Sequence, residues 1–168
     1  MKSFCRFSIM AVAFLALTGS ALAVDLSTNA LVTIVEGLSI TEGTALNFGE
    51  LALNSGTVVV GAEAGAVTDA DNLVTDNASI SQGIFSVVGL TNWDVQVDCT
   101  AGTMPAGLTL STFVADWADG DSEGAVPLTR TMLADTEQVE IGASLAVDRS
   151  TATTGAAQLP YTVSVTFQ

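Results

Sequence analysis

A cluster of four acidic residues is the clearest candidate for a metal site in the sequence. The residues are Asp116, Asp119, Asp121 and Glu123, with a glycine between the second and the third. Calcium prefers several carboxylate oxygens on a flexible loop, but these residues do not follow the EF-hand spacing, which places acids at alternate positions before its glycine. Two interpretations stay open: a calcium site, or an acidic loop in solvent with no cofactor. The sequence favours the second.

The two tryptophans are candidates for stacking against a sugar ring. Trp93 begins an alternating segment and shares the parity of Val95 and Val97, so we expect it to pack in the core. Trp117 lies among acidic residues, and we expect it to be partly exposed. A lectin-like role therefore stays open as an alternative.

The charge composition argues against several function classes. The 168 residues carry 18 acidic and 4 basic side chains and no histidine. Removing a leader of residues 1–23 leaves 145 residues, and loss of Lys2 and Arg6 changes the net charge from −14 to −16. Only Arg130 and Arg149 would then be available for phosphates, so we expect no nucleic-acid binding. Since acid–base and nucleophilic catalysis mostly use His or Lys, we expect no enzyme activity.

The N-terminus has the three parts of a secretory signal peptide. Basic residues within 1–6 precede an apolar stretch at 7–18, and Ser20-Ala-Leu-Ala23 follows with the small-x-small pattern of a cleavage site. The apolar stretch is shorter than the roughly 20 residues that span a bilayer. We therefore predict a signal peptide at 1–23, export of a single domain at 24–168, and no membrane span. Cys99 would be the one cysteine left, so no intrachain disulfide is expected.

Alternation of apolar and polar residues predicts strands along most of the exported chain. The pattern is strict at 139–148 and is repeated at 93–99 and 161–168. About seven to nine short strands separated by turn-forming residues, with no convincing helix, predict one immunoglobulin-like antiparallel β-sandwich; a jelly roll is the alternative. The residues expected to face the core are Trp93, Val95, Val97, Cys99, Val139, Ile141, Ala143, Leu145 and Val147.

Residues 30–51 resemble the opening of a Gram-negative family of exported domains of unknown function, which is itself similar to fimbrial subunits. The resemblance is carried by Leu38-Ser-Ile40 and Leu46-Asn-Phe48-Gly49, and by the Thr/Val alternation of the last strand at 161–168. Glu36-Gly37 stands where the family often has a proline. The resemblance implies a location in the periplasm, at the cell surface or outside the cell, and admits a periplasmic chaperone as a partner.

The resemblance also points to chaperone–usher pilins, and the chain departs from them in two ways. Those pilins donate an N-terminal extension of about a dozen residues to the next subunit, whereas only 24–29 precede the first predicted strand here. They also usually carry a disulfide. Either the sandwich is complete in itself, or the strand at 30–41 is the donated one.

The sequence as a whole predicts an exported structural surface subunit, pilin-like or matrix-forming, that assembles by β-strand addition with other copies or other surface subunits. The strands at 31–40 and 161–168 carry almost no charge and no lysine, the residue that commonly protects an exposed sheet edge. The alternative is an exported monomeric module that binds carbohydrate or calcium. The candidate contact residues are Val32, Ile34, Leu38, Ile40, Tyr161, Val163, Val165 and Phe167.

Overall fold

The computed structural model describes residues 37–118 and 123–168, which are almost entirely β-structure. The predicted signal peptide lies outside these ranges, as do Val32, Ile34, Asp119 and Asp121. A single short 3-10 turn, η1 (Glu63–Gly65), is the one helical element among the described residues. None of those residues belongs to a helix long and apolar enough to cross a membrane.

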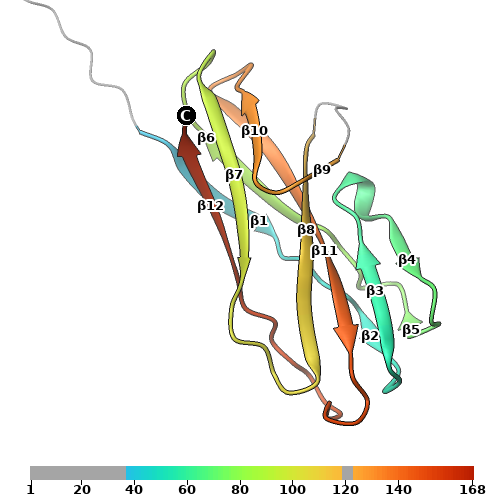
Figure 1. Cartoon of the computed structure of the whole chain (residues 1–168). Coiled ribbons are helices and arrows are strands. Elements are labelled where there is room, and N and C mark those ends of the chain that lie inside the picture. Colours follow the sequence, from blue (N-terminus) through green and yellow to red (C-terminus); the bar gives the residue numbers. More distant parts are fainter. Residues whose placement is uncertain (1–36, 119–122) are drawn as a thin grey trace, which may run out of the picture. The chain divides into compact units, whose positions relative to one another are not determined.

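The larger sheet is antiparallel and is built around its longest strand, β11. Its seven strands are β1 (Ser39–Thr44), β3 (Gly56–Val60), β4 (Val67–Asp69), β6 (Gly83–Val88), β8 (Leu108–Trp117), β9 (Gly124–Ala125) and β11 (Thr136–Val147). β11 pairs with β8, and it also pairs with β6 along its first half and with β3 along its second half. β1, β4 and β9 extend the sheet beyond β6, β3 and β8 (Figure 1).

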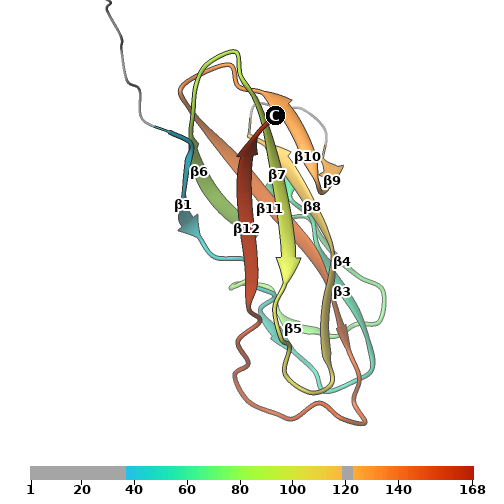
Figure 2. The ribbon, with the colours of Figure 1, turned by 60° about the vertical axis from the view of Figure 1, so that its left-hand side comes forward.

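The smaller sheet has three antiparallel strands in the order β10-β7-β12: β10 (Leu128–Thr131), β7 (Asp94–Ala101) and β12 (Tyr161–Phe167). β7 is the central strand, and its residues Val95, Val97 and Cys99 are buried as the alternation predicts. β2 (Glu50–Leu51) and β5 (Val74–Asp76) form a separate two-stranded sheet. Figure 2 shows the smaller sheet lying in front of β11 and β8.

The strand order is that of an immunoglobulin-type sandwich with one strand missing. An immunoglobulin constant-type domain pairs its strands A-B-E-D in one sheet and C-F-G in the other. Apart from the segment that carries β2 to β5 and the short strands β9 and β10, this chain gives β1-β6-β11-β8 in one sheet and β7-β12 in the other. Among the described residues, no strand takes the place of G beside β12. The predicted all-β antiparallel sandwich is confirmed, and the described residues form seven strands of five residues or more and five shorter ones.

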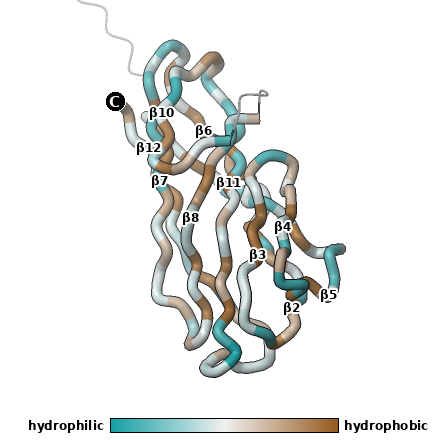
Figure 3. The backbone as a smooth tube through the Cα atoms, turned by 45° about the vertical axis from the view of Figure 1, so that its right-hand side comes forward, coloured by the Kyte–Doolittle hydropathy of each residue, from teal (hydrophilic) through white to brown (hydrophobic). Residues whose placement is uncertain are grey.

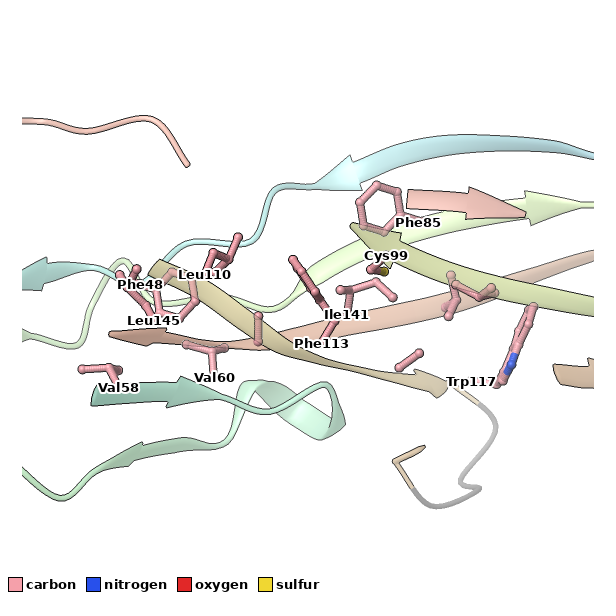
Figure 4. Close-up of a cluster of buried hydrophobic side chains, with 14 of the residues drawn as sticks. Phe48, Val58, Val60, Phe85, Cys99, Leu110, Phe113, Trp117, Ile141 and Leu145 are labelled. Atoms are coloured by element: carbon pink, nitrogen blue, oxygen red, sulfur yellow. The ribbon is translucent and has the colours of Figure 1, made fainter. Parts of the chain in front are cut away.

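The core lies between the two sheets and is formed mainly by β11 and the strands next to it. From Val139 to Val147, the odd-numbered residues of β11 are at most 7% exposed, as predicted. Figure 4 shows Ile141 and Leu145 among buried side chains of β3, β6 and β8 in the same sheet and with Cys99 of β7 in the other sheet. Figure 3 shows β3 as a hydrophobic stretch. Cys99 is a buried free thiol, and no disulfide links the described residues. Packing of apolar side chains therefore holds the two sheets together.

β8 changes the face that it buries in the middle of its length. Its early residue Leu110 is buried at an even position, but Phe113 and Trp117 are buried at odd positions. The pairing with β11 is irregular between Gly142 and Ser144, and Thr112 has a φ of 49°. A bulge of this kind adds one residue and reverses the alternation beyond it. It turns Trp117 into the core.

Candidate functional site

β1 is an edge strand of the larger sheet, β12 is an edge strand of the smaller sheet, and the two lie next to each other. Among the described strands, β1 pairs only with β6, and β12 pairs only with β7. Each strand therefore keeps one edge of backbone N–H and C=O groups outside the sheets. The two strands touch across the open side of the sandwich, where Figure 2 shows both together. On this open side the smaller sheet ends at β12, with no described strand in the position of strand G.

A groove of about 980 Å³ lies between these two edges. Its walls come from β1, from β12 and from the loops that precede β8 and β12. The lining residues are Ile40, Glu42, Ala45, Phe85, Thr103, Met104, Pro105, Gln158, Leu159, Pro160, Tyr161 and Val163. We call it the β1–β12 groove. Glu42 is the one charged side chain in this lining, so the groove favours an apolar guest.

Tyr161 forms part of the wall of the β1–β12 groove and is held in place by two aromatic contacts. Its ring stacks on Phe113 with centroids 5.9 Å apart and meets Phe85 edge-on at 6.5 Å. Burial raises the pKa of the Tyr161 phenol, an effect that the backbone of Leu46 partly offsets. The ring is therefore held by the core on one side while it lines the groove on the other, which gives the groove a fixed wall.

The structure brings three of the predicted contact residues into the groove. Ile40, Tyr161 and Val163 line it. The other described ones, which are half-buried against the core without lining the groove, are Leu38, Val165 and Phe167. The remaining two, Val32 and Ile34, lie outside the described residues.

The sequence analysis missed the loop residues of the groove. Met104 and Pro105 come just before β8, and Leu159 and Pro160 come just before β12. An apolar residue followed by proline before each strand is the signal that could have drawn attention to them, because proline has no N–H to donate to a sheet and favours an extended conformation in the residue before it.

The placement of the two tryptophans is the reverse of the prediction. Trp93 is 52% exposed, and Trp117 is 2% exposed. Trp93 precedes β7 in a turn, where its N–H donates to the carbonyl of Leu90, so the alternation of β7 does not extend to it. Its ring rests against Phe167 with centroids 5.5 Å apart. Trp117 is buried by the bulge in β8, with the Arg130 guanidinium 5.5 Å from its ring centroid.

Of the four residues of the calcium hypothesis, the structure describes Asp116 and Glu123, which lie next to the paired residues Ala115 of β8 and Gly124 of β9. Asp116 is 4% exposed in β8. Glu123 accepts hydrogen bonds at Oε2 from the N–H groups of Ala62 at 2.6 Å and Glu63 at 3.3 Å, so it holds the η1 segment. Within the described ranges, no group of three or more His, Cys, Asp or Glu is placed to hold a metal. The calcium site stays a prediction.

Acidic residues at the end of β4 and in the turn that follows it accept hydrogen bonds from backbone N–H groups. Asp69 accepts hydrogen bonds from the N–H groups of Leu73 and Val74, which lower the pKa of its carboxyl. Asp71 accepts one from the N–H of Thr57. These carboxylates fix the turn that leads into β5, and they give this loop a structural role.

One family comparison finds a match to the chain. A family model described as "Domain of unknown function (DUF4402)" matches residues 38–167, a range that includes every described strand from β1 to β12. No curated protein and no solved structure matches. The description of the family names no activity, so a function has to be argued from the β1–β12 groove and the surface of the domain.

Proposed function

The chain belongs to the DUF4402 family, whose function is unknown, and we propose that it is an exported structural surface subunit that assembles by β-strand addition. In this proposal the subunit is pilin-like or matrix-forming and acts in the periplasm, at the cell surface or outside the cell. Its partners are other copies or other surface subunits, with a periplasmic chaperone before assembly. The signal peptide predicted at 1–23 provides the export.

The observation that carries the proposal is the free edge of β12 beside an apolar groove. A strand that entered the β1–β12 groove would pair with the backbone of β12 and place alternate side chains against Ile40, Tyr161 and Val163. It would take the position of strand G in an immunoglobulin-type sheet. Strand addition of this kind satisfies exposed backbone groups and buries apolar surface at the same time.

The donated strand is best sought before Gly37. β12 pairs along its whole length with β7, and Ser39 and Ile40 pair with β6, so these residues belong to their own sandwich. This moves the expected donor from the strand predicted at 31–40 to residues 24–36, which share only 31–36 with that strand. Thirteen residues extend about 43 Å as a strand, and the seven of β12 about 23 Å, so the segment is long enough to cover β12.

Deletion of residues 24–36 tests the proposal. The full exported chain is expected to form linear polymers, seen by electron microscopy and light scattering, and the deleted chain is expected to stay monomeric. The matched substitutions are Val32→Asp and Thr33→Asp, which put a charge on opposite faces of the donated strand. Only one of them should abolish polymers. A full-length chain that stays monomeric at high concentration and in its native envelope would contradict the proposal.

The second candidate function is an exported monomeric module that binds carbohydrate. The observation that favours it is the exposure of Trp93, since an aromatic face in solvent suits stacking on a sugar ring. A glycan array with the exported chain and with Trp93→Ala separates the two functions. Binding that disappears in Trp93→Ala would support the carbohydrate module.

A further inference from the structure

The end of the sandwich at which β12 stops exposes two large apolar side chains. Trp93 is 52% exposed, and Leu133, in the turn between β10 and β11, is 66% exposed. The two turns are joined, because the N–H of Met132 donates to the carbonyl of Trp93. Asp94, the first residue of β7, directly follows Trp93, and Asp135 lies in the same turn as Leu133. We call this surface, formed by Trp93, Asp94, Leu133 and Asp135, the Trp93 end.

Hydrogen bonds hold the Trp93 end in one arrangement. The N–H of Gln168 donates to the carbonyl of Asp94, and the N–H of Gly89 donates to that of Asp135. The carboxylate of Asp135 accepts hydrogen bonds from both the hydroxyl and the N–H of Thr91, which lower the pKa of Asp135. The lowered pKa keeps the Asp135 carboxylate charged at neutral pH, and the acidic residue Asp94 directly follows the exposed Trp93 in the chain. This combination suits a cation.

The opposite end of the sandwich carries a cation. Arg149 follows β11 in an exposed turn, where its N–H donates to the hydroxyl of Ser55, and it makes no ion pair with another described residue. The same end contains the loop that precedes β8, because the N–H of Asp148 donates to the carbonyl of Gly107. Figure 1 shows the β11–β12 connection at one end and the C-terminus at the other. We call this second surface the Arg149 end.

The direction of the strands determines which ends would meet in a polymer. β12 runs from the Arg149 end to the Trp93 end, since Tyr161 pairs with Ala101 and Phe167 with Val95. The chain enters its own sandwich at the Trp93 end, where Ser39 pairs with Val88. A donated strand antiparallel to β12, the arrangement of strands F and G, runs the other way and leaves the groove at the Arg149 end of the acceptor. The Trp93 end of the donor copy then faces the Arg149 end of the acceptor.

From this geometry we infer an end-to-end contact between copies, in which Arg149 of the acceptor lies over the Trp93 ring of the donor. The inference rests on the proposed strand addition. Asp94 and Asp135 supply the opposite charge, and Leu133 supplies apolar surface beside the ring. A guanidinium within about 6 Å of an indole centroid is attracted to its face, and more strongly where water is excluded. The contact would set the angle between successive subunits.

Disulfide cross-linking between two full-length chains tests this contact. One chain carries Leu133→Cys and the other carries Ser150→Cys, while the native Cys99 is buried in both. Mild oxidation of the mixed polymer is expected to give a covalent dimer. Ser111→Cys, at an exposed position in the middle of β8, replaces Ser150→Cys in the control and should give none. Adding Trp93→Ala or Arg149→Glu to the test pair should lower the yield at least severalfold, and Arg149→Lys should retain most of it.

The outcomes separate this inference from the proposed function. Polymers that form without the Leu133–Ser150 dimer would overturn the end-to-end contact and leave strand addition intact. A dimer whose yield is unchanged by Trp93→Ala and Arg149→Glu would overturn the role of both residues. If no polymer forms under any condition, strand addition fails and the contact fails with it. Glycan binding by Trp93, with the cross-link unaffected by Trp93→Ala, would assign the ring to a carbohydrate instead.

Discussion

β11 and β12 have the same alternating pattern, but they differ in what surrounds them. β11 has partners on both edges and buries its odd-numbered residues from Val139 onward. In β12 the odd-numbered residues from Tyr161 to Phe167 are only half-buried, and β7 is the one described partner. Side-chain alternation therefore shows which face of a strand turns inward, while the number of neighbours decides how far that face is covered. β12 is a strand with a face that a further strand could complete.

The largest expected effect is in β11. Leu145→Asp places an unpaired charge at a site that is 3% exposed, and we expect it to lower the free energy of unfolding by about 3–5 kcal/mol. Chemical denaturation followed by Trp fluorescence measures this loss. A loss below about 1 kcal/mol would mean that the centre of β11 is not the core of the fold.

The two tryptophans give the next largest contrast. Trp117→Ala removes a side chain that is 2% exposed and is expected to cost about 3–5 kcal/mol, as large aromatic truncations in cores do. Trp93→Ala removes one that is 52% exposed and should cost about 1 kcal/mol or less. Thermal unfolding of both variants checks the order. Equal losses would contradict the reversal of burial between the two residues.

A charge on β12 should weaken assembly as well as folding. Val163 is half-buried and lines the β1–β12 groove, so Val163→Asp is expected to cost about 1–2 kcal/mol of folding stability. In a polymer the same charge would be covered by the added strand, and we expect association to weaken by at least about tenfold. The control is Ser164→Asp, at the exposed neighbouring position. Analytical ultracentrifugation of both variants measures the difference, and equal association would argue against the groove.

How much of this could be predicted from the sequence depends on the element. Alternation was sufficient for Val95, Val97 and Cys99, and for the buried residues of β11, because a regular strand keeps its parity. It failed at Trp93, where the chain turns before β7 begins, and at Trp117, where the bulge at Thr112 reverses the parity of β8. Neither a turn nor a bulge leaves a clear mark on hydrophobic spacing.

The groove could be predicted only in part for a related reason. Its strand residues Ile40, Tyr161 and Val163 follow from alternation and low charge. Its loop residues, such as Met104 and Leu159, are brought to the groove by the way that the loops before β8 and β12 fold back on the sandwich. The pairing of β12 on one edge only is a property of the whole topology, and no local pattern in the chain encodes it.

The thiol of Cys99 is the most local probe of β12, and the smallest effect is expected there. Cys99 lies on β7, and β7 pairs with β12 at Cys99 and Val163. Burial, and secondly the charge of Asp98, raise the pKa of Cys99 from its ordinary 9.0 to about 12. At pH 8 the folded thiol should react about a thousandfold more slowly with a disulfide reagent than the unfolded one. The pKa of Cys99 is higher in the folded chain than in the unfolded one, so the protonated thiol is favoured by folding. Its contribution to stability is fully present below about pH 9 and is lost as the pH rises toward 12. Rapid reaction in the folded chain would show that β12 separates readily from β7.

Binding of a peptide to the free edge of β12 tests the central claim most directly. A labelled peptide with the sequence of residues 24–36 is added to the full-length chain at low concentration, with a scrambled peptide as the control, and amide hydrogen exchange is followed along the chain. Strand addition predicts binding of one peptide per chain and slower exchange in β12, with β10 on the other edge of the smaller sheet unchanged. Exchange in β12 that is the same with either peptide, or with none, would contradict the account.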